Sequence, residues 1–102
     1  MRRVLLSHDD KVLMYSVPDE VADHLKDYCL EFCSNWIWEN PKGAKLLKKI
    51  EGLTVAVYGV PDFIDYLNEW IFPEQQSSFI KELNCYFDEL PDEYKKYPYF
   101  NF

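Results

Sequence analysis

Aromatic side chains limit the folds open to this chain more than any other feature, because three Trp, eight Tyr and seven Phe fall within 102 residues. Each ring removes a large apolar area from water when it is buried, so we expect rings to fill most of the core. Five of them end the chain: Tyr94, Tyr97, Tyr99, Phe100 and Phe102. The length is near the commonest domain size, which predicts a single domain over residues 1–102 with residues 91–102 as an aromatic tail.

The overall composition indicates a globular protein, since 48% of the residues are hydrophobic, 28% are charged and only three are glycine. No apolar run approaches the roughly 18 residues that a membrane-spanning helix needs. The first ten residues lose their apolar character too early for a signal peptide. Cys29, Cys33 and Cys85 are odd in number, whereas small secreted domains pair their cysteines. We therefore expect reduced thiols and a cytoplasmic protein without membrane contact.

The first half of the chain predicts a hairpin followed by a long helix. Residues 3–7 and 11–17 are rich in strand-forming side chains, and a polar tetrapeptide separates them. Apolar residues then recur at helical spacing along one stripe, while acidic residues fill the opposite face. The stripe consists of Val21, Leu25, Tyr28, Cys29, Phe32 and Trp36. Pro41 ends the helix, because proline cannot continue its hydrogen-bond ladder.

The second half predicts one more strand and two main helices. Residues 44–50 indicate a short helix, although they also suit a strand, and residues 53–58 have the β-branched alternation of a strand. Helices are predicted at about 62–72, where the wide apolar arc indicates packing on more than one side, and at 76–89. The fold class is therefore α+β, with a small, mostly antiparallel three-stranded sheet packed against three main helices. Parallel pairing of repeated βα units is the alternative.

Two octapeptides, residues 12–19 and 55–62, match at five of eight positions and both run from a strand into a helix. Duplication of a strand–helix unit is one interpretation. Convergence is the other, since proline suits the first helical position and aspartate the first turn. Leu90, Pro91 and Asp92 repeat the pattern without a strand, which favours convergence.

Charge is unevenly distributed along a chain whose net charge is −7. Residues 62–93 hold a single lysine, Lys81, against nine carboxylates. Such a surface repels phosphate backbones, so no nucleic-acid partner is expected. It suits either a basic protein partner or a face that only maintains solubility. The partner-binding residues that we predict are Asp62, Asp65, Glu69, Glu82, Asp88 and Glu89. We interpret the opposite patch of Lys42, Lys45, Lys48 and Lys49 as a solvated helix face.

No motif in the chain predicts catalysis or a cofactor. It contains no glycine-rich phosphate loop and no zinc-protease helix motif. Cys29 and Cys33 lie one helical turn apart on an inward face, which is typical of core thiols. His8 with Asp9 and Asp10 reads as a polar turn. We therefore predict no catalytic residue, no cofactor and no metal.

Two functional hypotheses follow from these patterns. The first is a cytosolic, non-enzymatic interaction domain that docks a basic partner, in the manner of an immunity or inhibitor protein. The second is a structural protein that self-associates as a homodimer through Leu30, Trp38, Tyr97, Tyr99, Phe100 and Phe102. The tail itself suits either a strap that completes the core or a set of anchors for a partner. An enzyme is a distant third, and it needs a pocket that joins His8 or His24 to thiols or carboxylates.

Overall fold

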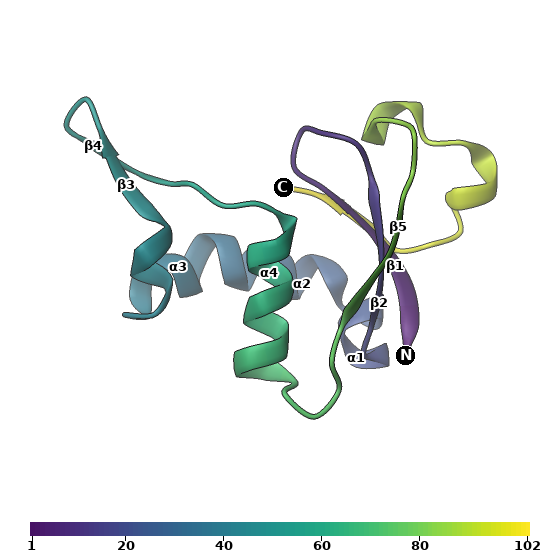
Figure 1. Ribbon diagram of the computed structural model, residues 1–102, viewed down its shortest axis with the longest axis horizontal. Helices are drawn as coiled ribbons and strands as arrows, with labels where there is room; N and C mark the ends of the chain where they lie inside the picture. The colour runs from purple at the N-terminus through teal and green to yellow at the C-terminus, as the bar shows by residue number, and fades with distance from the viewer.

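A four-stranded sheet forms the centre of the protein, which is described by a computed structural model of residues 1–102 (Figure 1). The strand order is β5–β2–β1–β6. β1 (Arg2–Ser7) and β2 (Leu13–Val17) form the predicted antiparallel hairpin. β5 (Ser78–Glu82) is antiparallel to β2, and β6 (Tyr99–Asn101) is parallel to β1. The α+β class is confirmed, with four strands in this sheet instead of three.

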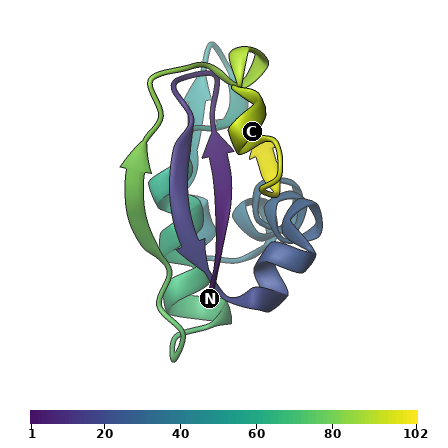
Figure 2. The same ribbon diagram turned by 90° about the vertical axis from the view of Figure 1, so that its right-hand side faces the viewer.

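Two helical runs cover one face of the sheet (Figures 1 and 2). The first run consists of α1 (Asp19–Asp23), α2 (Leu25–Leu30), a π-helical segment (Glu31–Trp36) and α3 (Ile37–Glu39). The second consists of α4 (Val60–Tyr66) and a π-helical segment (Leu67–Ile71). Both runs lie where the apolar spacing predicts helices. The first ends beside Asn40, whose extended backbone precedes Pro41.

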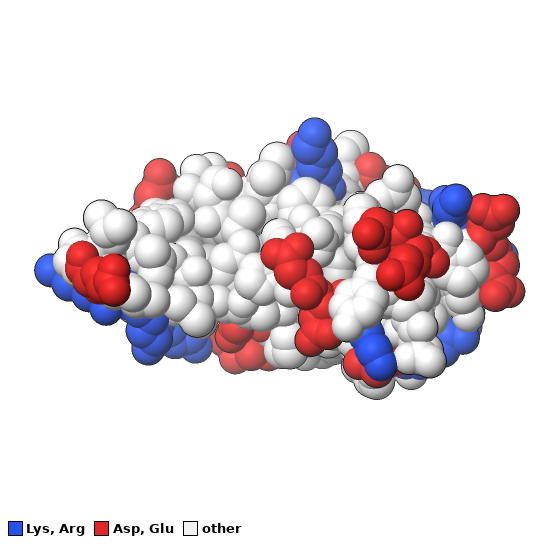
Figure 3. Space-filling model, turned by 90° about the horizontal axis from the view of Figure 1, so that it is seen from above, with Lys and Arg blue, Asp and Glu red and all other residues white.

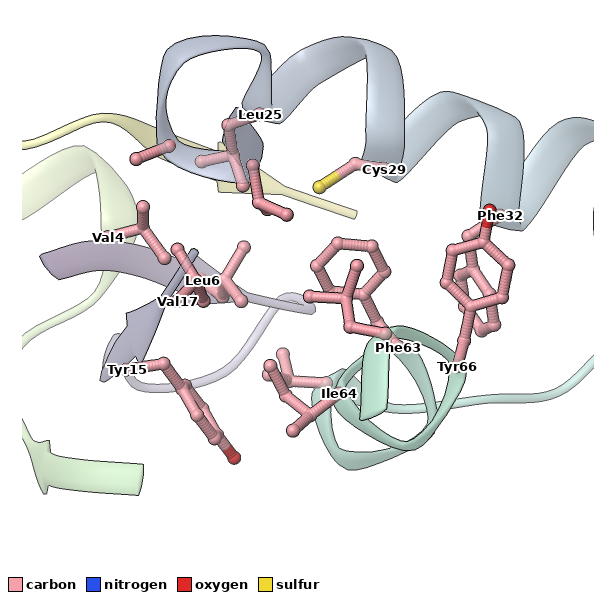
Figure 4. Packing of buried hydrophobic residues seen from close by; sticks show 14 of the residues in the cluster. Val4, Leu6, Tyr15, Val17, Leu25, Cys29, Phe32, Phe63, Ile64 and Tyr66 are labelled. Carbon is pink, nitrogen blue, oxygen red and sulfur yellow. The ribbon is translucent and has the colours of Figure 1, made fainter. Parts of the chain in front are cut away.

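The larger core lies between the sheet and the two helical runs (Figure 4). Val4 and Leu6 reach it from β1, because alternate side chains of a strand share a face. The predicted helical stripe also enters it, and its members Val21, Cys29 and Phe32 are fully buried. Burial of each side chain of this size contributes roughly 1.5–3 kcal/mol to the free energy of folding, so the stripe fixes the first helical run on the sheet.

Phe32 is the centre of an aromatic cluster, which consists of Phe32, Trp36, Tyr58, Phe63, Tyr66 and Phe102. The centroids of the other five rings lie 5.2–6.3 Å from that of Phe32. Three of these five contacts are edge-to-face, the arrangement that ring quadrupoles favour. The cluster therefore joins both helical runs to the last residue of the chain.

A smaller core lies on the other face of the sheet, where the segment between β5 and β6 covers it. Leu5, Met14 and Leu83 are buried there. Their cover is provided by the half-buried side chains of Cys85, Phe87, Leu90, Tyr94 and Tyr97. The sheet thus has apolar side chains on both faces, which makes the molecule three layers deep (Figure 1).

The predicted helix at 76–89 is wrong. Its first part is β5, and the rest is irregular apart from a 3₁₀ turn at Phe87–Glu89. β5 pairs with β2, and the ring of Phe79 packs edge-to-face on Tyr15 at 5.6 Å. Leu83 enters the smaller core. The apolar spacing fits a helix, but pairing with a distant strand determines the structure.

The predicted third strand forms, but outside the main sheet. β4 (Leu53–Ala56) pairs only with β3 (Leu47–Ile50), and together they make the β3–β4 arm. The short helix predicted at 44–50 is therefore reduced to a 3₁₀ turn over Gly43–Leu46. Glu51 and Gly52 both have positive φ, at 51° and 82°, which is the type I′ geometry of a tight hairpin. The arm projects from the helical layer, away from the sheet (Figure 1).

The two similar octapeptides both run from a strand into a helix, as the sequence predicts. Residues 12–19 join β2 to α1, and residues 55–62 join β4 to α4. The two strands belong to different sheets, so the similarity does not extend to strand pairing.

Substituting Gly43 with alanine should destabilise the protein, because an added Cβ would lie 2.6 Å from the carbonyl oxygen of Trp36 and 2.7 Å from Cα of Ile37. Both are backbone atoms, so relief requires the helix end to move. We expect the free energy of unfolding to fall by about 1–3 kcal/mol in urea denaturation. Gly59→Ala is the matched control, since its nearest neighbour would lie 3.5 Å away. Equal stabilities of the two variants would contradict this packing.

Candidate functional site

The predicted partner-binding carboxylates separate into two groups. Asp62, Asp65 and Glu69 lie on the second helical run and line a hollow of about 420 Å³. Lys42 and Lys45 line the same hollow, so both signs of charge meet across it. Its apolar wall is formed by Trp36, Leu46, Tyr66 and Trp70.

The charges of this hollow act mainly on one another. Burial, with Glu69 and Asp62 nearby, raises the pKa of the Asp65 carboxyl, and Lys45 partly opposes this rise. Asp62 also has a structural role, because its Oδ2 accepts a hydrogen bond from the backbone N–H of Gly59 at 2.8 Å. That contact satisfies a backbone N–H at the start of α4. This face is therefore partly neutralised within the chain.

The second group of carboxylates forms what we call the acidic pole: Asp9, Asp10, Asp88 and Glu89. All four are exposed, and they line one hollow of about 470 Å³ together with Tyr86, Phe87 and Asn101. Asp9 and Asp10 come from the β1–β2 turn, and the others from the 3₁₀ turn after β5. Figure 3 shows acidic side chains gathered over these two segments. None of the four takes part in a salt bridge.

Asn101 holds the β1–β2 turn in place at the acidic pole. Its Oδ1 accepts hydrogen bonds from Ser7 Oγ at 2.8 Å and from the backbone N–H of Asp9 at 3.0 Å. Its Nδ2 donates to Asp9 Oδ1 at 3.2 Å. Asp9 has φ of 55°, a left-handed conformation that aspartate tolerates better than most residues. β6 therefore fixes the turn that carries two of the four carboxylates.

Glu82, the remaining predicted carboxylate, lies beside the acidic pole but in a separate hollow. It ends β5 and lines a hollow of about 280 Å³ with His8, Asp10 and Lys11. Lys11 directs its ammonium group to Asn84 Oδ1, at 3.0 Å. The sequence therefore identifies Asp88 and Glu89 correctly as surface carboxylates, but nothing local in it connects them with Asp9 and Asp10.

The residues predicted for self-association lie in two places. Leu30 and Trp38 are 39% and 46% exposed on the first helical run, where the indole N–H of Trp38 donates to the Cys33 carbonyl. The tail residues Phe100 and Phe102 are half-buried against the larger core, and Tyr97 is half-buried against the smaller one. Tyr99 is exposed. The tail is thus ordered on its own domain.

Phe102→Ala should destabilise the protein if the tail is a strap. The centroid of its ring lies 5.4 Å from that of Phe63 and 5.6 Å from that of Tyr58, so removing the ring leaves a gap in the aromatic cluster. We expect a loss of about 2 kcal/mol in the free energy of unfolding, measured by urea denaturation. Tyr86→Ala, at an exposed ring, should cost much less. Equal losses for the two variants would show that the tail does not contribute to the core.

Cys29, Tyr58 and Tyr66 in the larger core are held in their neutral forms. Burial, with a smaller effect from Cys33, raises the pKa of the Cys29 thiol well above its usual range. Burial raises the pKa of Tyr66 to about 12, assisted by Glu31 and Tyr28. Burial and Cys33 raise that of Tyr58 to about 12. All three cysteines are free. Cys29, Tyr58 and Tyr66 therefore act as uncharged packing groups at neutral pH.

Tyr66→Phe should make the protein less sensitive to alkali. The pKa of Tyr66 is about 12 in the folded protein, against an ordinary value of 10.0. Because the folded value is higher, the stabilisation is complete below pH 10 and is lost as the pH rises through 12. The free energy of unfolding should therefore fall less steeply over this range in the variant, as measured by urea denaturation. Tyr86→Phe, at an exposed tyrosine, is the control, and equal slopes for both variants would refute the expectation.

The two histidines lie in different settings. His8 packs its ring on Tyr58 at a centroid distance of 4.9 Å. His24 is exposed between Glu20 and Asp27, with nitrogen–oxygen distances of 3.9 and 4.0 Å. No group of three or more His, Cys, Asp or Glu side chains is arranged to hold a metal ion.

Comparison with protein-family models, curated protein sequences and solved structures gives no match to this chain. None of its helices combines the length and apolar character that crossing a bilayer requires.

Proposed function

We propose that this protein is a non-enzymatic interaction domain that docks a basic protein partner at the acidic pole. The observation that supports the proposal most directly is that Asp9, Asp10, Asp88 and Glu89 surround one hollow and form no salt bridge. Like charges held close together repel one another, and a cationic partner relieves that repulsion. Their field also speeds the encounter with such a partner.

The hollow combines charge with aromatic surface, as interaction sites commonly do. Tyr86 and Phe87 line it, and Tyr86 is exposed. Aromatic side chains offer large contact areas at low entropic cost, which suits them to the centre of an interface. The carboxylates around them would form a polar rim. A partner segment that carries lysine or arginine beside apolar side chains fits this arrangement.

The group formed by Asp62, Asp65 and Glu69 is a weaker docking site within the same proposal. Lys42 and Lys45 line its hollow, so a basic partner would meet opposing positive charge. The proposed location is cytoplasmic, which three free cysteines support. Self-association through Leu30 and Trp38 stays the alternative.

Reversing two charges of the acidic pole should weaken binding to a basic peptide. The probe is a ten-residue peptide of alternating lysine and leucine, and affinity is measured by isothermal titration calorimetry at low salt. Asp88→Lys combined with Glu89→Lys should raise the dissociation constant at least about tenfold, since each lost contact with a charged partner costs on the order of 1 kcal/mol. Added salt should weaken binding to the unmodified protein.

Two matched variants separate the acidic pole from the net charge. Glu74→Lys with Glu93→Lys makes the same change in net charge at exposed positions outside the hollow. Asp65→Lys with Glu69→Lys tests the helical group. Binding that falls equally in all three double variants would reflect net charge alone, and binding unchanged by Asp88→Lys with Glu89→Lys would overturn the proposal.

A further inference from the structure

The β3–β4 arm has one apolar face that is largely uncovered, with Val55 half-buried and its neighbours exposed. Ile50 and Leu53 are opposite one another in the register and are 54% and 69% exposed. Val55 lies on the same face by strand alternation, and Val57 follows it at 50% exposure. On the other face, Leu47 and Ala56 pack against the larger core at the base of the arm. The uncovered face therefore consists of adjacent aliphatic side chains at the far end of the molecule (Figure 1).

An isolated two-stranded hairpin is at best marginally stable in water. This arm is kept in register by its type I′ turn, yet β3 and β4 pair only with each other. Aliphatic residues on an exposed strand face gain stability when another surface covers them. The arm thus has the properties of a docking element whose cover comes from outside the chain.

The charge of the arm is opposite to that of the acidic pole. Lys48 shares the apolar face, because it is two residues before Ile50, and Lys49 lies on the other face. Lys42 and Lys45 are at the base, and Glu51 is the single acid of the hairpin. Viewed from above, basic side chains lie along the arm end beside one acidic group, and most acidic side chains lie toward the other end, with basic ones among them (Figure 3). The protein therefore carries a basic, aliphatic projection and an acidic, aromatic hollow at different places on one surface.

We propose that the β3–β4 arm of one copy docks on the acidic pole of a second copy, so that molecules associate head to tail. The inference rests on the proposed function, and it names the basic partner as another copy of this chain. Lys48, on the apolar face, meets the four carboxylates, while Ile50 and Leu53 cover the rings of Tyr86 and Phe87, and Lys49 on the other face adds to the positive field of the arm. The contact is heterologous, so in a head-to-tail pair one copy keeps a free arm and the other a free pole, and further copies can add at both ends.

Charge complementarity favours this occupant over two others. Two arms packed through the same face would bring Lys48 of each copy close together, which like-charge repulsion opposes. An anionic membrane would attract the arm but repel the rest of the molecule, because the net charge of the chain is −7. A surface that is acidic and partly aromatic matches both the lysines and the aliphatic side chains of the arm.

Sedimentation velocity of the full chain at low salt tests the association. The arm presents a small area, so we expect concentration-dependent growth of the sedimentation coefficient at about 0.1–1 mM, reversed by added salt. Lys48→Glu with Lys49→Glu should abolish the growth. Lys26→Glu with Lys95→Glu makes the same change in net charge at exposed positions elsewhere and should retain it.

Mixing two variants, each of which lacks one half of the proposed contact, tests whether the association is head to tail. Ile50→Ser with Leu53→Ser removes only the apolar face of the arm, at exposed positions where the fold loses little. Asp88→Lys with Glu89→Lys removes only the pole. Each variant should sediment as a monomer, whereas the mixture should form a one-to-one dimer and nothing larger, because it contains one intact arm and one intact pole.

The outcomes separate this inference from the proposed function. A protein that stays monomeric at 1 mM, yet binds the lysine–leucine peptide at the acidic pole, would overturn the head-to-tail contact and leave the proposed function standing. Association that survives Asp88→Lys with Glu89→Lys would also overturn it and assign self-association to another surface, such as Leu30 and Trp38. Binding of the arm to phosphatidylserine vesicles, lost with Lys48→Glu and Lys49→Glu in a monomeric protein, would assign the arm to a membrane instead.

Discussion

The packing of Phe32 is the interaction on which the rest of the structure depends. Its ring lies between rings of α4 and the last residue of the chain. The centroid of Phe32 is 5.6 Å from that of Phe63 and 6.3 Å from that of Phe102. It therefore fixes three segments that are distant in sequence. The base of the arm packs on the same core through Leu47 and Ala56, and β6 at the C-terminus lies beside β1. Since Asn101 in β6 secures the turn that carries Asp9, the same packing positions both surfaces of the proposed contact.

Local patterns in the sequence predict the elements whose energetics are local. The hairpin of β1 and β2 and both helical runs lie where the sequence predicts them, because the spacing of apolar residues within each segment is enough to indicate the element. β5 was predicted as part of a helix, since Phe79, Ile80 and Leu83 suit a helical stripe as well as a strand. Its conformation is determined by pairing with β2, a contact between residues such as Ser16 and Ser78 that lie more than sixty positions apart, which no local pattern encodes.

The candidate site is likewise predicted only where it depends on local sequence, and not where it depends on contacts between distant segments. Charge predicts Asp88 and Glu89 as partner-binding residues, whereas the sequence places Asp9 and Asp10 only in a polar turn. The acidic pole exists because β5 and β6 bring the two segments together. The strand at 53–58 was recognised from its alternation, whereas its partner was not. The turn at Glu51 and Gly52 makes β3 its immediate neighbour, so a short local hairpin replaces the expected strand of the main sheet.

Separation of charge and apolar surface explains how such an arm persists without causing aggregation. Exposed strands with aliphatic faces are sites of unwanted pairing unless charged side chains interrupt them. Lys48 interrupts this face, so two arms repel, and the net charge of −7 keeps molecules apart in other orientations. An acidic surface with aromatic rings between its carboxylates avoids both the repulsion between lysines and the general repulsion between acidic molecules. The lysine that prevents arm-to-arm pairing is thus the one that selects the acidic pole, and a single residue serves solubility and specificity together.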